Sequence, residues 1–185
     1  MPLPEDGYGL LPAIEVDPAL LAAFHCGKAH LDTFLRQAAD FHRARLGLTT
    51  VAFHRDVAGV IGYFTLANDA LPLTTSEQLE LNVNVDLRAY PAVKLGRLAV
   101  ARHLQGQGIG EQLMSFIHGE ILDSDSLSAA RLVILDADND SRVVAFYRKA
   151  GYQESLWAEA LAKSHRPGKS GAPQATVKMI RDILA

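Results

Sequence analysis

The stretch Leu95–Gly110 reads LGRLAVARHLQGQGIG, and it predicts a strand, a glycine-rich turn and the start of a helix. Gly106, Gly108 and Gly110 let the backbone approach a ligand closely and leave peptide N–H groups facing outward. The helix that follows adds unpaired N–H groups and a partial positive charge at its N-terminus. This combination makes the turn a candidate binding site for a pyrophosphate group.

Two common phosphate-binding motifs do not match this turn. The P-loop requires a lysine directly after its last glycine, and no lysine follows Gly110. The dinucleotide fingerprint requires the spacing G-x-G-x-x-G, whereas the spacing here is G-x-G-x-G. The turn on its own therefore leaves open a second interpretation, a glycine-rich connection that binds no ligand.

The segments on either side of this stretch alternate between strand and helix patterns. Strands are predicted at residues 11–16, 49–54, 57–67, 92–100, 131–137, 152–156 and 175–183. Helices are predicted at residues 31–46, 109–122 and 140–150. Between them, residues 68–90 are expected to form a long, partly ordered excursion, and residues 163–173 have loop composition. Strand–helix–strand units in the second half imply an α/β fold with a partly parallel sheet, which an antiparallel hairpin precedes.

Length and composition fit one folded domain spanning residues 1–185. The chain has 185 residues, of which 49% are apolar and 21% charged, and both fractions are ordinary for a globular protein. No apolar run approaches the roughly 18 residues that a membrane-spanning helix needs. Residues 1–17 carry several acidic side chains and no Lys or Arg, unlike a signal peptide. We therefore expect a cytoplasmic protein that does not associate with membranes.

The cysteine and histidine content gives no indication of a metal site. Cys26 is the single cysteine, so it cannot form an internal disulfide, which fits a reducing compartment. A buried apolar role suits it better than a nucleophilic one, because no local signature accompanies it. The seven histidines are scattered and match no zinc motif, so we expect no metal.

A second landmark is a helix that carries a tyrosine, Tyr147, and is followed by the Gly151-Tyr152 pair. Earlier in the chain, the sequence Leu-Ala-Val at the end of a strand is followed by Gln105–Gly110, which fits the pattern [QR]-x-x-G-x-[GA]. The order and spacing of these features, over roughly residues 92–155, resemble those of the GNAT acetyltransferase superfamily. The resemblance implies a mixed, centrally splayed β-sheet with flanking helices, and an enzyme that transfers acetyl from acetyl-coenzyme A to a primary amine.

The resemblance also assigns the coenzyme contacts. Backbone groups would pair with the pantetheine arm at Leu98, Ala99 and Val100. The pyrophosphate would be held by backbone amides around Gln105, Gly106, Gln107, Gly108, Ile109, Gly110 and Glu111. Asp140 stands where the family often has an asparagine, and a carboxylate cannot donate a hydrogen bond to the coenzyme. Capping of the helix that follows is the alternative role for Asp140.

Tyr147 is the candidate catalytic acid, because a phenol can supply a proton to the leaving thiolate. A packed aromatic side chain is the alternative. A backbone N–H near Val100 would polarise the thioester carbonyl. The strand at 92–100 carries Lys94 and Arg97 but none of the glutamates that many GNAT enzymes have there. This lack favours an acceptor amine of low pKa, although a water chain to a residue such as Glu80 or Asp86 remains a second possibility.

A narrower resemblance concerns the acceptor. The strings at 24–28, 31–35 and 62–67 look like those of GNAT toxins from toxin–antitoxin pairs. That subgroup acetylates the α-amine of aminoacyl-tRNA and is inhibited by a ribbon-helix-helix antitoxin, and the resemblance also implies a homodimer. Arg97 would then contact a substrate phosphate, or else be a cation on the strand surface. The net charge of −3 argues against a nucleic-acid substrate.

Two alternatives to this function remain. The acceptor could be a small amine or a protein N-terminus, which are also nucleophiles of low pKa. The protein could also bind coenzyme A without catalysing transfer.

Overall fold

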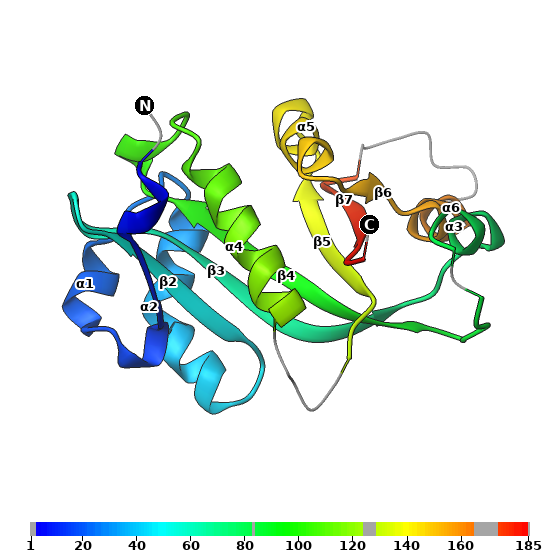
Figure 1. Cartoon of the computed structure of the whole chain (residues 1–185), viewed down its shortest axis with the longest axis horizontal. Helices are drawn as coiled ribbons and strands as arrows, with labels where there is room; N and C mark the ends of the chain where they lie inside the picture. The colour runs from blue at the N-terminus through cyan, green and yellow to red at the C-terminus, as the bar shows by residue number, and fades with distance from the viewer. Residues whose placement is uncertain (1–2, 83, 124–128, 165–173, 185) are drawn as a thin grey trace. The chain divides into compact units, whose positions relative to one another are not determined.

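The computed structural model describes residues 3–82, 84–123, 129–164 and 174–184. The chain divides into two compact units: unit 1 comprises Met1–Ala67 and Leu95–Ser124, and unit 2 comprises Asn68–Lys94 and Asp125–Ala185. Two long strands, β3 (Val57–Leu71) and β4 (Tyr90–Val100), run through both units (Figure 1). The strand order is β1-β2-β3-β4-β5-β7-β6, which is the mixed α/β sheet with flanking helices that the sequence predicts.

The remaining elements follow the two patterns of the sequence. The other strands are β1 (Tyr8–Pro12), β2 (Leu48–His54), β5 (Leu132–Asp138), β6 (Gln153–Glu154) and β7 (Thr176–Asp182). The α-helices are α1 (Pro18–Ala23), α2 (Ala29–Arg43), α3 (Thr75–Glu80), α4 (Ile109–Asp123), α5 (Ser141–Lys149) and α6 (Leu156–Ser164). Short 3-10 helices lie at Glu5–Gly7, Ala13–Glu15 and Arg102–Leu104.

Unit 1 is a sheet with α2 and α4 on opposite faces. Its first three strands pair antiparallel, and successive residues of β3 point to opposite faces. On one face, the Tyr63 hydroxyl donates a hydrogen bond of 2.9 Å to the Leu31 carbonyl, where α2 begins. On the other, a Cβ at Gly62 would lie only 2.8 Å from Leu113 Cδ1 of α4. Glycine at this position therefore allows the helix that follows the glycine-rich turn to pack directly on the sheet.

Unit 2 is built on the antiparallel pairs β5–β7 and β7–β6. Leu132 and Ile134 of β5 share a buried cluster with Ile180 of β7, and Trp157 of α6 packs against it. The fully buried Glu77 carboxylate joins α3 to α6: its Oε1 accepts from the Leu156 N–H at 2.8 Å, while Oε2 accepts from Thr74.

Several predicted elements are confirmed, and two strands are wrong. The hairpin at 49–67 and the helices at 109–122 and 140–150 match β2–β3, α4 and α5 closely. The strand predicted at 11–16 lies earlier, because the chain turns into a 3-10 helix after Pro12. The strand predicted at 152–156 has only two paired residues, since Glu77 caps a helix that starts at Leu156. The short helices α1, α3 and α6 were not predicted, and residues 165–173 of the predicted loop lie outside the described part.

Candidate active site

The turn between β4 and α4 has the backbone geometry of an anion site. Gly106 and Gly108 have φ angles of +76° and +84°, a region that side chains with a Cβ rarely enter. A Cβ at Gly106 would meet no atom within 4 Å, so the turn faces open space there. The first N–H groups of α4 have no acceptor within the helix, and α4 is long enough to have a substantial dipole. These features fit a pyrophosphate held by backbone amides.

The two glutamines of the turn use their side chains within the protein. The Gln105 Nε2 donates to the carbonyls of Val100 and Cys26, at 3.0 and 2.8 Å. The Gln107 Nε2 donates to the His103 carbonyl at 3.0 Å. Both side chains therefore stabilise the turn. Each residue would contact a coenzyme through its backbone.

A loop from the N-terminal region supports this turn, and sequence reasoning missed that contact. Besides the Gln105 bond to Cys26, the Arg102 N–H donates to the His25 carbonyl at 2.9 Å. Asp32, buried at the start of α2, accepts from the Cys26 N–H at 2.8 Å and lies 2.7 Å from His25 Nδ1. Burial raises the pKa of Asp32, but these hydrogen bonds outweigh it and hold the pKa below its ordinary value. The string Phe24–Lys28 is thus part of the site's support.

Cys26 has the buried position that the sequence predicts. Its side chain is 6% exposed, and burial together with the neighbouring Asp32 raises the pKa of the thiol. A thiol with a raised pKa is a poor nucleophile at neutral pH, so Cys26 contributes packing.

Arg97 is exposed on β4 and lies over Phe34 of α2. Its guanidinium carbon lies 4.9 Å from the centre of the Phe34 ring, and its Nη1 donates to the Gly96 carbonyl at 2.6 Å. Stacking on Phe34 restricts the side chain while leaving its charge exposed to solvent. This geometry suits a contact to a phosphate and is equally compatible with a cation on the strand surface.

Tyr147 lies in unit 2, on α5. Its carbonyl accepts from the Tyr152 N–H at 3.0 Å, and the two rings pack edge to face with centroids 5.8 Å apart. Burial, and next the nearby Asp138 carboxylate, raise the pKa of Tyr147 to about 12. Within the described residues the Tyr147 hydroxyl has no hydrogen-bond partner. It is therefore a protonated phenol at neutral pH, able to donate.

Four further residues of the sequence analysis have defined places in unit 2. Asp140 Oδ1 accepts from the N–H groups of Arg142 and Val143, which shows the helix cap proposed for it. Lys94 forms an ion pair of 2.7 Å with Asp136, a carboxylate that it shares with Lys178, so the strand cation is engaged within the protein. Glu80 and Asp86 are both exposed, and neither has a feature that marks it as a general base.

The described residues contain no group of three His, Cys, Asp or Glu side chains placed to hold a metal ion. Among the helices of the same described segments, none is long and apolar enough to cross a membrane.

A family model of the acetyltransferase (GNAT) domain matches residues 48–154 of this chain. Because the match covers more than half of the chain, the protein belongs to the GNAT acetyltransferase family. It is therefore an N-acetyltransferase, and acetyl-CoA is the donor that this family uses.

Solved structures of bacterial toxins share the fold over nearly the whole chain. A mutant of KacT has a TM-score of 0.69 and 18% sequence identity, and the similarity covers 96% of both chains. AtaT complexed with acetyl-methionyl-tRNAfMet has a TM-score of 0.67 and 20% identity, covering 92% of this chain and 93% of that one. An AtaT mutant toxin bound to the C-terminus of the antitoxin AtaR and acetyl-CoA has a TM-score of 0.62 and 20% identity, covering 96% and 94%. At these identities the likeness shows the fold.

Proposed function

We propose that this acetyltransferase modifies the α-amine of aminoacyl-tRNA and acts as the toxin of a toxin–antitoxin pair. The observation that carries the proposal is the likeness to AtaT complexed with acetyl-methionyl-tRNAfMet, which extends over 92% of this chain. The similarity therefore extends well beyond the 107 residues at 48–154 that the family model matches.

Acetyl-CoA would supply an acetyl group activated as a thioester. Backbone amides from Gly106 to Glu111 would hold its pyrophosphate, supported by the positive φ angles of the turn and the N-terminus of α4. Leu98, Ala99 and Val100 would pair with the pantetheine arm as a neighbouring strand does. Gln105 and Gln107 would take part through their backbone, because their side chains already donate to protein carbonyls.

The chemistry needs few side chains of this protein. The neutral amine attacks the thioester carbonyl, so a C–N bond forms and the C–S bond breaks, and the amine loses a proton to solvent. Tyr147 would donate its phenolic proton to the departing sulfur, and the N–H near Val100 would stabilise negative charge on the carbonyl oxygen. A raised phenol pKa keeps the Tyr147 proton in place until negative charge develops on the departing sulfur.

The absence of a carboxylate on β4 favours an acceptor amine of low pKa. Lys94 is paired with Asp136, and the rest of β4 has no carboxylate that could deprotonate an amine of high pKa. An amine with a pKa near 7.8 is substantially neutral at physiological pH, whereas only about 0.1% of lysine side chains are. The aminoacyl α-amine fits this requirement, and a small amine or a protein N-terminus of similar pKa is the second candidate.

The same proposal includes a partner and a location. A ribbon-helix-helix antitoxin would inhibit the enzyme, as expected from its likeness to AtaT bound to AtaR. A homodimer in the cytoplasm, where aminoacyl-tRNA is found, completes the proposal, and light scattering at micromolar concentration tests the dimer.

Release of coenzyme A thiol across a panel of acceptors separates the candidates. The proposal predicts thiol release with charged tRNA and little with deacylated tRNA, small amines or peptide N-termini. Thiol release with small amines or peptides alone would show that the acceptor is the second candidate, a small amine or a protein N-terminus. Coenzyme binding without thiol release for any acceptor would indicate a non-catalytic protein.

A further inference from the structure

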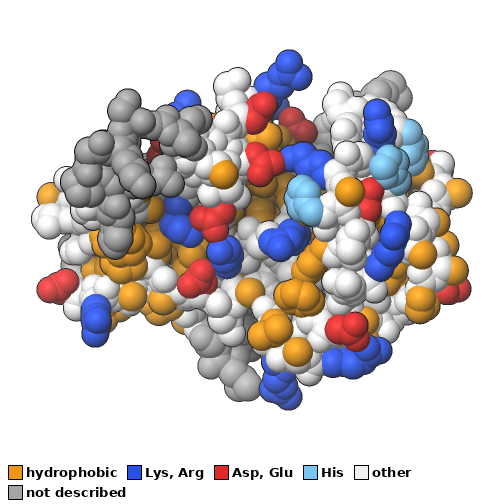
Figure 2. Space-filling view, turned by 180° about the vertical axis from the view of Figure 1, so that it is seen from behind, with side chains coloured by type: hydrophobic (Ala, Val, Ile, Leu, Met, Phe, Trp, Pro, Cys, Tyr) orange, Lys and Arg blue, Asp and Glu red, His pale blue; other side chains and the backbone are white. Residues whose placement is uncertain are grey.

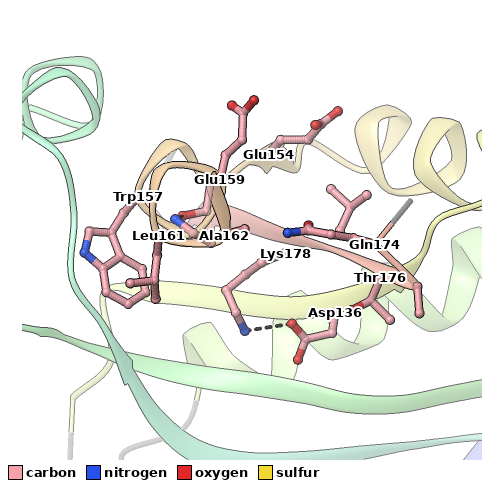
Figure 3. Close-up of a pocket in the computed structure, with 13 residues that line it drawn as sticks. Asp136, Glu154, Trp157, Glu159, Leu161, Ala162, Gln174, Thr176 and Lys178 are labelled. Carbon is pink, nitrogen blue, oxygen red and sulfur yellow. Dashed lines mark hydrogen bonds and ion pairs between the residues drawn. The ribbon is translucent and has the colours of Figure 1, made fainter. Parts of the chain in front are cut away.

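A pocket of about 610 Å³ lies within unit 2, between α6 and the strands β5 and β7. Figure 3 shows Trp157 and Leu161 of α6 on one side of it and the Lys178–Asp136 ion pair on another. The volume falls in the range of small-molecule sites, and none of the residues assigned above to coenzyme or acid catalysis lines it.

One wall of the pocket is apolar and flat. Trp157 packs against the cluster of Leu132, Ile134 and Ile180 and remains partly exposed to the pocket. Leu161, one helical turn further along α6, is 41% exposed. Figure 2 shows hydrophobic side chains next to charged ones on the surface of this unit. An indole held in place by a buried cluster and exposed beside it is a stacking surface for a planar ring.

The ion-pair cluster at the floor of the pocket carries an excess of positive charge: Asp136 and Lys178 line the pocket, and Lys94 contacts Asp136 without lining it. Asp136 accepts from Lys178 at 2.8 Å and pairs with Lys94 at 2.7 Å, so two ammonium groups share one carboxylate. Asp136 and Lys178 are cross-strand partners, and they lie on the same face as Ile134 and Ile180 because their positions differ by two. One unit of positive charge is therefore left without a counterion.

The acidic residues at the rim do not cancel this charge. Glu154 pairs with Arg148, and Glu159 pairs with Lys163 one turn along α6 at 2.6 Å. The pocket thus combines an aromatic wall with a cationic floor. An anion with a planar ring complements both features, whereas an uncharged apolar group complements only the wall.

We propose that this pocket binds one nucleotide of an RNA substrate, with its base against Trp157 and its phosphate beside Lys178. The inference rests on the proposed function, since unpaired nucleotides at the acceptor end of tRNA carry the aminoacyl group. Stacking on an aromatic side chain accepts any base, and a lysine recognises phosphate as a point charge. The pocket adds affinity for RNA to a protein whose net charge is −3.

Trp157 is the only tryptophan of the chain, so its fluorescence reports on this pocket alone. The probe is 5′-phosphorylated cytidylyl-cytidine, titrated with the protein saturated with coenzyme A so that the coenzyme's own nucleotide site is filled. We expect saturable quenching, with about tenfold weaker binding for Lys178→Ala and for unphosphorylated cytidine. Lys178→Gln keeps most of the side-chain volume and should show the same weakening if the alanine variant is unstable.

Arg55→Ala is the matched control, because Arg55 pairs with Asp6 in unit 1 and should leave the quenching unchanged. Absence of quenching, or an affinity in both Lys178 variants equal to that of the wild type, would overturn the inference. Equal affinity for octanoate would also overturn it, because the pocket would then select an apolar anion. These titrations involve no acetyl transfer. Acetylation of charged tRNA without quenching would contradict nucleotide binding in this pocket and support the proposed function. Quenching without acetylation would support nucleotide binding and contradict the proposed function.

Discussion

The glycine-rich turn of unit 1 would bind a ligand through its backbone, whereas the pocket of unit 2 would bind one through its side chains. The turn presents backbone N–H groups, while the side chains of Gln105 and Gln107 bind the protein's own carbonyls. The pocket presents the side chains of Trp157 and Lys178, and its backbone is engaged in α6 and the β5–β7 pair. Substitutions of side chains should therefore be tolerated at the turn and damaging at the pocket, while loss of a glycine should be damaging at the turn.

The largest effect is expected for Gly108→Glu. A carboxylate at the N-terminus of α4 would occupy the pyrophosphate position and repel it, so coenzyme affinity should fall by at least about 100-fold. Because Gly108 has a φ of +84°, any side chain also adds backbone strain. Calorimetry of coenzyme binding measures the effect.

Gly108→Ala and Gln107→Ala are the controls for that variant. The alanine at 108 has the strain without the charge and should lose about tenfold or less. Gln107→Ala removes only a brace to His103 and should change affinity by about twofold at most. A larger loss for Gln107→Ala than for Gly108→Glu would contradict recognition by the backbone.

Tyr147→Phe should lower kcat by roughly 100-fold, the usual contribution of a positioned proton donor. The ring contact with Tyr152 survives this change, so coenzyme affinity and stability should remain as in the wild type. Single-turnover kinetics with charged tRNA measures the rate of acetyl transfer separately from the affinity for the coenzyme. Turnover at the wild-type rate would reduce Tyr147 to a packing residue.

The pH profile checks the state of the same phenol. Because the pKa of Tyr147 is raised to about 12, the phenol keeps its proton throughout the usual assay range. The rate should rise as the acceptor amine loses its proton near pH 8 and then stay level to about pH 10. A fall that begins below pH 10 and disappears in Tyr147→Phe would contradict the raised pKa.

Asp32→Asn and Asp182→Asn compare one buried carboxylate from each unit. Asp182 is bound by Arg131 through two hydrogen bonds of 2.8 and 2.7 Å, as Asp32 is by Cys26 and His25. Each variant should lose about 2 kcal/mol of unfolding free energy at pH 7. Only Asp32→Asn should also weaken coenzyme binding, by several-fold, because Asp32 supports the loop that contacts the turn.

The pH dependence of these losses has a definite sign. Burial opposes the ionised form of both carboxyls, but hydrogen bonds lower both pKa values below the ordinary range. Their stabilisation is therefore complete above about pH 5 and is lost as the pH falls below about 4. Urea unfolding from pH 7 to 3 should show that the unfolding free energy depends less on pH in each variant than in the wild type. Asp40→Asn, which breaks an exposed pair with Arg43, should cost less than about 0.5 kcal/mol.

Arg97→Ala should have the smallest effect. If Arg97 contacts one phosphate of tRNA, the logarithmic dependence of apparent affinity on salt should flatten by about one contact. Arg43→Ala, another exposed arginine of unit 1, is the matched control and should leave the slope unchanged. Equal slopes in Arg97→Ala and the wild type would make Arg97 a surface cation.

The turn and its helix could be predicted from the sequence because their determinants are local. The glycines of 106–110 set the backbone, and α4 begins at Ile109 as predicted. Local signals also existed for two helices that were missed. Asp17 with Pro18 caps α1, and Thr74 with Glu77 forms a capping box for α3.

The pocket could not be predicted in the same way. The N-terminus of α6 is capped by Glu77, which lies 79 positions earlier in the chain. The Lys94–Asp136–Lys178 cluster joins three strands, and its assembly depends on the strand order and on the β5–β7 register. The support of the turn by His25 and Cys26 is a tertiary contact of the same kind. Pairings between distant segments leave no pattern in a single sequence.

The measurement that tests the central claim most directly uses labelled acetyl-CoA and bulk charged tRNA. The account predicts that label appears on tRNA as an N-acetyl-aminoacyl ester, that deacylated tRNA stays unlabelled, and that Tyr147→Phe slows labelling by roughly 100-fold. Digestion of the labelled tRNA then identifies the amino acid. Absence of label in charged tRNA, with small amines or peptide N-termini labelled under the same conditions, would contradict the account.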